Sequence, residues 1–98
     1  MPLFAQQLNG ATAADIRKVY AEKYRGPLVS YADTADESGF LSALAMAETD
    51  GMKIAVAGND ERILLLAVYD NLGKGASGAA VECMNLAIGA ERTTGLVL

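Results

Sequence analysis

The sequence contains no histidine and no tryptophan, and its one cysteine is Cys83. Without histidine the chain lacks the commonest general base, the usual partner of a nucleophilic serine or cysteine, and the commonest metal ligand. A single cysteine cannot form an internal disulfide, which fits a reducing cytoplasm. We therefore expect neither a complete catalytic site nor a metal site in these residues.

Charge is also scarce. Only 20% of the residues are charged, the net charge is −4, and the basic residues form no cluster. This composition argues against nucleic acid and anionic membranes as partners. The longest apolar run, residues 63–69, is far shorter than the roughly 18 residues of a membrane span. The first residues lack the basic region of a secretory signal, so a cytoplasmic protein is predicted.

Apolar residues, by contrast, make up 52% of a chain of 98 residues. This length fits one small domain, residues 1–98. A small domain that is this apolar has surface left over after its own core is filled. The surplus predicts contact with another domain or subunit.

Hydrophobic spacing and turn residues predict an α+β fold. Thr12 and Asp15 are typical of a capped helix start, and Gly26-Pro27 would end that helix. Strands are predicted over residues 28–32, 52–57 and 62–69, the last two forming a hairpin around the turn at 58–61. A final helix over 76–88 would end at Gly89. This order indicates an antiparallel or mixed sheet with helices packed on it.

Several faces and loops carry their own expectations. The first helix should pack through a stripe consisting of Ile16, Val19, Tyr20, Lys23 and Tyr24. Residues 63–68 do not alternate, which indicates a central strand covered on both faces. Cys83 shares an apolar helix face with Ala80, Met84, Ala87 and Ile88, so it should be a core or interface residue.

Residues 33–51 are acidic and irregular, with one short helical turn expected around Phe40, Leu41, Leu44 and Met46. Asp33, Asp36 and Glu37 in this segment could serve acid–base or Mg²⁺ chemistry. A solvated loop is the better interpretation, because no second acidic cluster accompanies them.

Gly73, Gly75 and Gly78 spell G-x-G-x-x-G between a strand and a helix, the setting in which glycines cradle a phosphate. A dinucleotide fold needs a second parallel strand that ends in an acidic residue about 20 positions later. Only residues 91–98 follow the helix, so that fold is rejected. A P-loop is excluded because neither serine nor threonine follows Lys74. A tight, closely packed turn and a helix start that approaches a ligand both remain open.

The run Asp-Asn-Leu-Gly-Lys-Gly-Ala-Ser-Gly-Ala-Ala-Val at residues 70–81, followed by Met-Asn-Leu at 84–86, resembles a known family. It is similar to the C-terminal signature of N-acetyl-gamma-glutamyl-phosphate reductases, more closely to the second, shorter type. Aspartate-semialdehyde dehydrogenases are more distant and end similarly. The resemblance implies part of the C-terminal domain of a glyceraldehyde-3-phosphate-dehydrogenase-like reductase, whose N-terminal Rossmann domain holds most of the NADP.

The resemblance also implies roles for residues of the motif. Asn71, Gly75 and Ala76 would lie near the nicotinamide, and Lys74 would meet a substrate phosphate or carboxylate. From the residues themselves, Asn71 could equally cap the strand exit, and Lys74 could be a solvated turn lysine. Glu82 and Cys83 stand where relatives usually have amides.

The family's Asn-Pro-Gly-Cys nucleophile and its histidine motif are absent, so the chain is expected to be inactive alone. A fragment of a two-domain reductase is the leading hypothesis, with the missing Rossmann and catalytic portion or a second copy as partner. N-acetylglutamyl phosphate would be its substrate. A free-standing, non-catalytic oligomerisation or regulatory module and a small-anion binder are the alternatives.

Overall fold

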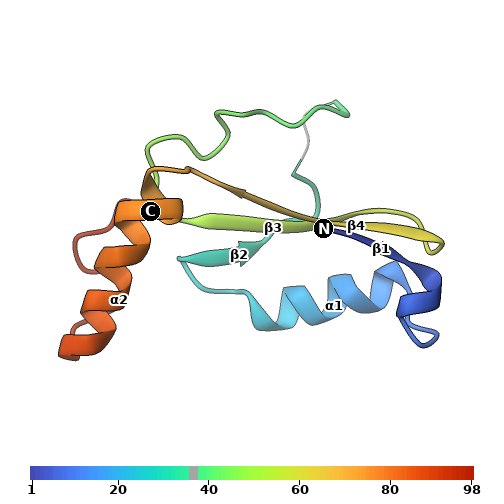
Figure 1. Cartoon of the computed structure of the whole chain (residues 1–98), viewed down its shortest axis with the longest axis horizontal. Coiled ribbons are helices and arrows are strands. Elements are labelled where there is room, and N and C mark those ends of the chain that lie inside the picture. The colour runs from blue at the N-terminus through green and yellow to red at the C-terminus, as the bar shows by residue number, and fades with distance from the viewer. Residues whose placement is uncertain (36–37) are drawn as a thin grey trace.

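The computed structural model describes residues 1–35 and 38–98, which form one mixed four-stranded sheet with two α-helices (Figure 1). The strands follow the order β1 (Pro2–Phe4), β4 (Arg62–Tyr69), β3 (Met52–Gly58) and β2 (Val29–Tyr31). β2 runs parallel to β3, and the other neighbours are antiparallel. The predicted α+β class is confirmed.

The β3–β4 hairpin is the longest paired element, running in register from Met52 opposite Tyr69 to Gly58 opposite Ile63. Its turn depends on Gly58, whose φ of +93° favours glycine. The side-chain oxygen of Asn59 accepts hydrogen bonds from the N–H groups of Glu61 and Arg62, both at 3.0 Å. The predicted hairpin is therefore confirmed, with the predicted kind of turn.

Helix α1 (Ala13–Lys23) begins at the predicted cap. The hydroxyl of Thr12 accepts the Asp15 N–H at 3.3 Å, and the Asp15 carboxylate accepts the Thr12 N–H at 2.8 Å. These bonds lower the pKa of Asp15, with the backbone hydrogen bond from Thr12 as the largest cause. The Ala13 N–H also donates to Asp60, at 3.0 Å, which ties the helix start to the hairpin turn.

Replacing Thr12 with alanine should lower the free energy of unfolding by about 1 kcal/mol, because the helix loses its N-cap acceptor. Chemical denaturation followed by circular dichroism measures the change. The variant Thr12→Ser keeps the hydroxyl and serves as the control. Equal losses for the two substitutions would contradict a capping role.

The core lies between α1 and one face of the sheet. Ala13, Val56 and Ile63 form its buried centre, and Ile16 and Tyr20 pack against them. The predicted packing stripe on α1 is wrong for two of its residues. Val19 is 56% exposed, and Lys23 is also exposed. The Ala13 amide bonds to Asp60, and this contact turns the start of the helix toward the sheet.

Within the described residues no helix covers the opposite face of the sheet, and residues 38–51 pass on that side (Figure 1). β4 is central, as predicted, but it is not covered on both faces. Leu64 is 41% exposed, and Phe4, two residues along β1 from its partner Pro2, is 50% exposed. An apolar strand without polar alternation is fully buried only when another element packs on each face of the sheet, and α1 packs on one face only.

The described part of residues 32–51 forms neither a helix nor a strand. The short helix expected around residues 40–46 is therefore absent from the described residues. Separate i to i+3 turns form over residues 42–49 in its place, such as the bond from the Ala47 N–H to the Leu44 carbonyl at 3.1 Å. Asp33 is exposed, and the predicted acidic residues Asp36 and Glu37 lie outside the described residues. Across the described ranges, no helix has the length and apolar character that crossing a membrane requires.

Candidate functional site

The glycine motif joins β4 to helix α2 (Gly78–Ile88). Residues Gly73–Ser77 form one π-helical turn, and α2 continues from it. π-Helical turns are rare and occur frequently at functional sites. The predicted final helix is confirmed, and so is its end: Gly89 has φ of +73° and donates to the carbonyls of Asn85 and Leu86.

Three amides of this turn, those of Gly73, Gly75 and Ser77, are already bonded within the chain. The Gly73 N–H donates to the Asp70 carboxylate at 3.1 Å, and the Gly75 N–H donates to the Asp70 carbonyl at 3.0 Å. Ser77 donates to the Leu72 carbonyl through its N–H, at 3.1 Å, and through its hydroxyl, at 2.8 Å. A phosphate cradle needs free N–H groups, so these bonds remove the main support for an anion site here.

Two of the three glycines instead allow close packing. A Cβ on Gly73 would lie 2.2 Å from the backbone oxygen of Thr49, and one on Gly78 would lie 2.3 Å from the Asp50 carboxylate. Asp50 also accepts the Val97 N–H at 2.9 Å and donates its own N–H to the Val97 carbonyl at 2.7 Å. The close-packed turn is therefore confirmed, and no motif or spacing indicates Asp50 as its partner.

The three residues expected to meet the cofactor, Asn71, Gly75 and Ala76, are all exposed on this turn. A Cβ on Gly75 would lie 3.2 Å from the Asn71 side-chain oxygen and 3.3 Å from the ring of Tyr69. The structure therefore brings Asn71 and Gly75 together. Asn71 also lines an open pocket of about 530 Å³. The other residues that line this pocket are Leu41, Ser42, Ala43, Ala67, Val68 and Tyr69.

Asn71 does not cap the strand exit, because Asp70 makes the bond to Gly73 that such a cap would make. Within residues 1–35 and 38–98, no hydrogen bond engages the Asn71 side chain. Its amide is free to hydrogen-bond a planar group such as a carboxamide. The turn therefore presents the Asn71 amide to solvent as an unengaged donor and acceptor.

Lys74, the residue expected to meet substrate, is not a solvated turn lysine. Its ammonium bonds to the Glu82 carboxylate at 2.5 Å, and its side chain is only 15% exposed. Arg92 approaches the other oxygen of Glu82 at 2.8 Å. The Arg92 guanidinium, and after it the Lys74 ammonium, hold the pKa of Glu82 below its ordinary value.

Sequence reasoning missed both polar residues on the inner side of α2, which are Glu82 and Asn85. The Asn85 side-chain amide donates to the carbonyls of Arg92 and Thr94, at 3.0 and 2.9 Å. In a regular helix, positions 74 and 82 lie about 80° apart around the axis, so their spacing gave no pairing signal. These bonds hold residues 92–94 against the helix.

The apolar side of α2 does not face the core. Cys83 is exposed, and so are Met84 and Ile88 on the same side. The expectation of a core cysteine is therefore wrong for the contacts within this chain, because Glu82 and Asn85 occupy the inner side. No group of three or more His, Cys, Asp or Glu side chains that could hold a metal occurs within the described ranges.

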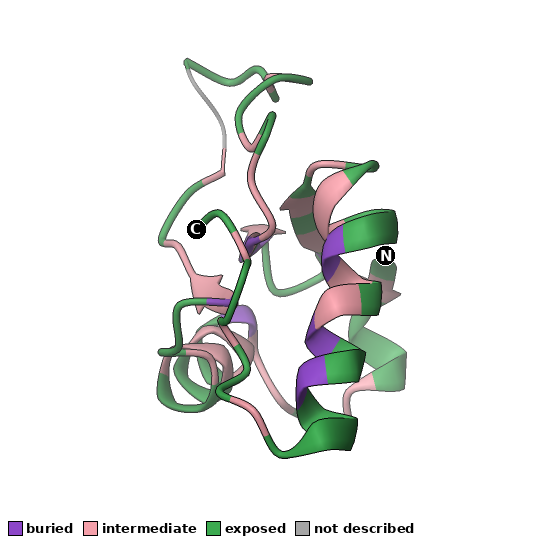
Figure 2. Ribbon diagram, turned by 90° about the vertical axis from the view of Figure 1, so that its left-hand side faces the viewer, coloured by how far each residue is buried: buried purple, intermediate pink, exposed green. Residues whose placement is uncertain are grey.

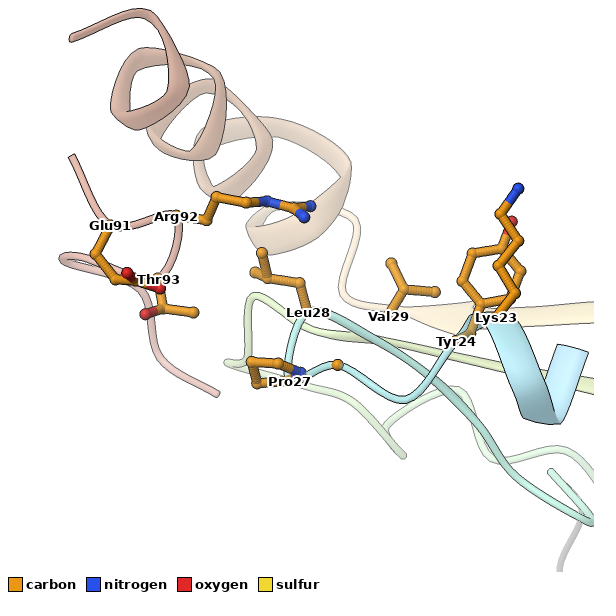
Figure 3. A pocket seen from close by; sticks show the side chains of 9 residues that line it. Lys23, Tyr24, Pro27, Leu28, Val29, Glu91, Arg92 and Thr93 are labelled. Atoms are coloured by element: carbon orange, nitrogen blue, oxygen red, sulfur yellow. The ribbon is translucent and has the colours of Figure 1, made fainter. Parts of the chain in front are cut away.

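A second cavity, of about 370 Å³, lies between the end of α1, the start of β2 and residues 91–93 (Figure 3). Leu28 and Val29 lie between Arg92 and Lys23, which occupy opposite ends of the view. The cavity shares Arg92 with the Glu82 ion pairs. Its lining includes neither cysteine nor histidine and so offers no nucleophile paired with a base.

Comparison with known proteins agrees with the motif. The chain is 41% identical over 95 residues to N-acetyl-gamma-glutamyl-phosphate reductases of Brucella ovis, Brucella canis and Brucella abortus. The matched region covers 91% of this chain and spans 31% of the length of these curated relatives. No family model matches the chain. The resemblance predicted from residues 70–86 is thereby confirmed, and it extends over nearly all of the chain.

Proposed function

We propose that this chain is the C-terminal portion of an N-acetyl-gamma-glutamyl-phosphate reductase, a cytoplasmic enzyme of arginine biosynthesis. The observation that carries this proposal is the identity of 41% across 91% of the chain. The whole enzyme would use NADPH to reduce N-acetylglutamyl phosphate to the semialdehyde and phosphate. Two thirds of the relatives' length lies outside the match, and that portion would bind most of the cofactor.

In this proposal the exposed turn supplies one side of the nicotinamide site. Asn71, Gly75 and Ala76 are the proposed contacts, with the Asn71 amide as the group that hydrogen-bonds the cofactor. Glycine at position 75 supports this placement, because a Cβ there would lie 3.2 Å from the Asn71 side-chain oxygen and would crowd the amide. NADPH supplies the hydride when bound; these residues only position and shield it.

Lys74 is the proposed contact to the substrate's phosphate or carboxylate. Its ammonium has three donors, and Glu82 engages it through one carboxylate oxygen. Glu82 would therefore fix the position of the ammonium while leaving donors for a substrate anion. The Arg92 guanidinium balances the carboxylate from the other side.

The chain alone should not catalyse the reaction. Reduction of an acyl phosphate through a thioester needs a thiolate beside an acid or base. The chain has no histidine, and its one cysteine lies exposed on the apolar side of α2. The nucleophile and its partner would come from the portion of the reductase that these residues do not match.

A chimera tests the proposal: the matched segment of the Brucella ovis reductase is replaced by these 98 residues. We expect the chimera to oxidise NADPH in the presence of N-acetylglutamyl phosphate, and the 98-residue chain alone to show no turnover. Within the chimera, Asn71→Ala should lower kcat/KM about tenfold, the effect of one lost polar contact of about 1.4 kcal/mol. Gln6→Ala, at another exposed amide, is the control.

Two results would contradict the proposal. Turnover by the 98-residue chain alone would show that it carries its own nucleophile. A folded chimera without activity would instead favour the alternative, a non-catalytic oligomerisation or regulatory module derived from the same family. Equal kcat/KM for Asn71→Ala and Gln6→Ala would reject the nicotinamide contact alone.

A further inference from the structure

The cavity between α1 and the segment that follows α2 is separate from the turn that carries Asn71. Its volume is about 370 Å³, and the residues that line it are Lys23, Tyr24, Gly26, Pro27, Leu28, Val29, Glu91, Arg92 and Thr93. Asn71, Gly75 and Ala76 are not among them. Pockets that hold small molecules usually measure about 300 to 1,000 Å³. The cavity therefore has room for a small ligand, and the proposed function leaves it unused.

Contacts with α2 fix one wall of this cavity. The Arg92 guanidinium lies 2.8 Å from the carboxylate of Glu82, a residue that is 8% exposed. The Asn85 side-chain amide donates to the carbonyls of Arg92 and Thr94. Figure 2 shows the buried residues of α2 as a strip on the side along which the C-terminal segment returns. Arg92 is thus held in place before a ligand arrives, which lowers the entropic cost of binding.

Backbone bonds fix the other wall, where the chain passes from α1 to β2. The Tyr31 N–H donates to the Tyr24 carbonyl at 2.9 Å, and the Met52 N–H donates to the Leu28 carbonyl at 2.8 Å. Leu28 is only 4% exposed. Together with Val29 it forms an apolar surface between the two ends of the cavity (Figure 3). Such a surface suits the methylene groups of a ligand.

A cationic side chain stands at each end of this apolar surface. The Arg92 guanidinium extends toward Leu28 and away from Glu91 (Figure 3). Only its Nη2 bonds to Glu82, and the side chain is 56% exposed, so its other N–H groups are available to a ligand. At the opposite end the Lys23 ammonium lies 5.8 Å from the centre of the Tyr24 ring. Across residues 1–35 and 38–98, no carboxylate pairs with Lys23.

We propose that this cavity binds a small aliphatic dicarboxylate. One carboxylate would bond to the available N–H groups of Arg92, because a guanidinium matches the planar shape of that group. The other carboxylate would pair with Lys23, and the methylene groups between them would cover Leu28 and Val29. All of these residues belong to this chain, so the inference stands apart from the proposed function.

Nuclear magnetic resonance tests this inference on the 98-residue chain, with glutarate as the probe and the ionic strength held constant. We expect the amide signals of Leu28, Val29 and Thr93 to shift together as glutarate is added, and that of Asn59 in the hairpin turn to stay unchanged. Butyrate has a similar chain but one carboxylate. It should bind at least tenfold more weakly, because it cannot engage both cations.

Two substitutions separate the cavity from a general attraction between charges. Lys23→Gln should weaken glutarate binding at least tenfold and leave butyrate binding unchanged. Lys18→Gln removes an exposed lysine of the same helix that does not line the cavity, and it should change neither. Arg92→Lys keeps a cation beside Glu82 but loses the planar guanidinium, so it should weaken both ligands.

Three results would overturn the dicarboxylate site. The first is equal weakening of glutarate by Lys23→Gln and Lys18→Gln, which would indicate attraction to surface charge alone. The second is equal affinity for butyrate and glutarate, which would leave Lys23 without a role. The third is a set of shifts that does not include Leu28, Val29 and Thr93, which would place the ligand elsewhere.

Equilibrium dialysis of labelled glutarate against the chimera described above extends the test to a whole reductase, and it also serves if the 98-residue chain does not fold alone. We expect a site whose affinity falls at least tenfold with Lys23→Gln. A dicarboxylate held at the substrate site would not depend on Lys23. A folded chimera without a Lys23-dependent site would show that another part of the reductase fills the cavity, and it would overturn the inference. NADPH oxidation by the same sample tests the proposed function separately.

Discussion

Replacing Gly73 with alanine is expected to lower the free energy of unfolding by about 3 kcal/mol, the upper end of the usual cost of overpacking. The new Cβ would lie 2.2 Å from the Thr49 backbone oxygen and 2.9 Å from the Asp50 carboxylate. A backbone atom cannot move aside as a flexible side chain can. The π-helical turn must therefore separate from the segment that leads into β3.

Chemical denaturation measures this change, and Gly26→Ala is its matched control. A Cβ on Gly26 meets nothing within 4 Å, and the residue is outside the left-handed region that favours glycine. We expect Gly26→Ala to change stability by less than about 1 kcal/mol. Similar losses for the two variants would show that the close approach of Gly73 to Thr49 is not a constraint on the fold.

The second large effect concerns Glu82. Glu82→Gln should lower the free energy of unfolding at pH 7 by about 2 kcal/mol, because two cations lose their buried carboxylate partner. This is below the usual cost of breaking a buried pair, since Arg92 is 56% exposed and stays solvated. Lys74, at 15% exposed, carries most of the penalty.

The loss should depend on pH in a defined direction. The folded pKa of Glu82 lies below its ordinary value of 4.5, so ionised Glu82 stabilises the protein fully above that pH. The contribution disappears as the pH falls through the folded pKa. The difference between the original protein and Glu82→Gln should therefore shrink steadily below about pH 4.5, as urea denaturation at a series of pH values would measure.

Asp15→Asn provides the comparison for this pH series. Asp15 also has a lowered pKa, but it lies at the exposed start of α1 and its main partner is the Thr12 backbone N–H. Its substitution should remove a different and smaller part of the acid dependence. A constant difference between Glu82→Gln and the original protein across the series would mean that Glu82 is not stabilised by its two cations.

Much of the fold could be predicted because its signals are local. Thr12 and Asp15 cap a helix through bonds three residues apart, and Gly58 and Asn59 close a hairpin through bonds within one turn. The motif at residues 70–86 indicated the family, and the 41% identity confirms that similarity. The expectations for Asn71, Gly75, Ala76 and Lys74 stay predictions, although the first two do lie together.

Two of the predictions that failed concerned which side of a helix faces inward. Val19 was expected to pack inward and Cys83 to lie in the core or at an interface, because both continue apolar stripes. Val19 is exposed, and Cys83 does not lie in the core of this chain. The contacts made instead are of two kinds: Ala13 bonds to Asp60, 47 residues away, whereas Glu82 pairs with Lys74 and Arg92, 8 and 10 residues away. Apolar spacing shows which side of a helix avoids water, but it cannot show whether that side packs within the same chain.

Residues close together in the chain were enough to predict both helices, strand β2, the β3–β4 hairpin with its turn, the helix caps and the similarity to a reductase, whereas the short strand β1 was not predicted. Tertiary structure alone decided that the glycines serve packing against Thr49 and Asp50. It also decided that Glu82 and Asn85 face inward and leave an apolar face outside. A buried carboxylate and amide must find partners, and Lys74, Arg92 and Thr94 supply them from 7 to 10 residues away. This separation exceeds the three- and four-residue spacing at which side chains pair on a helix, so the sequence pattern does not show it.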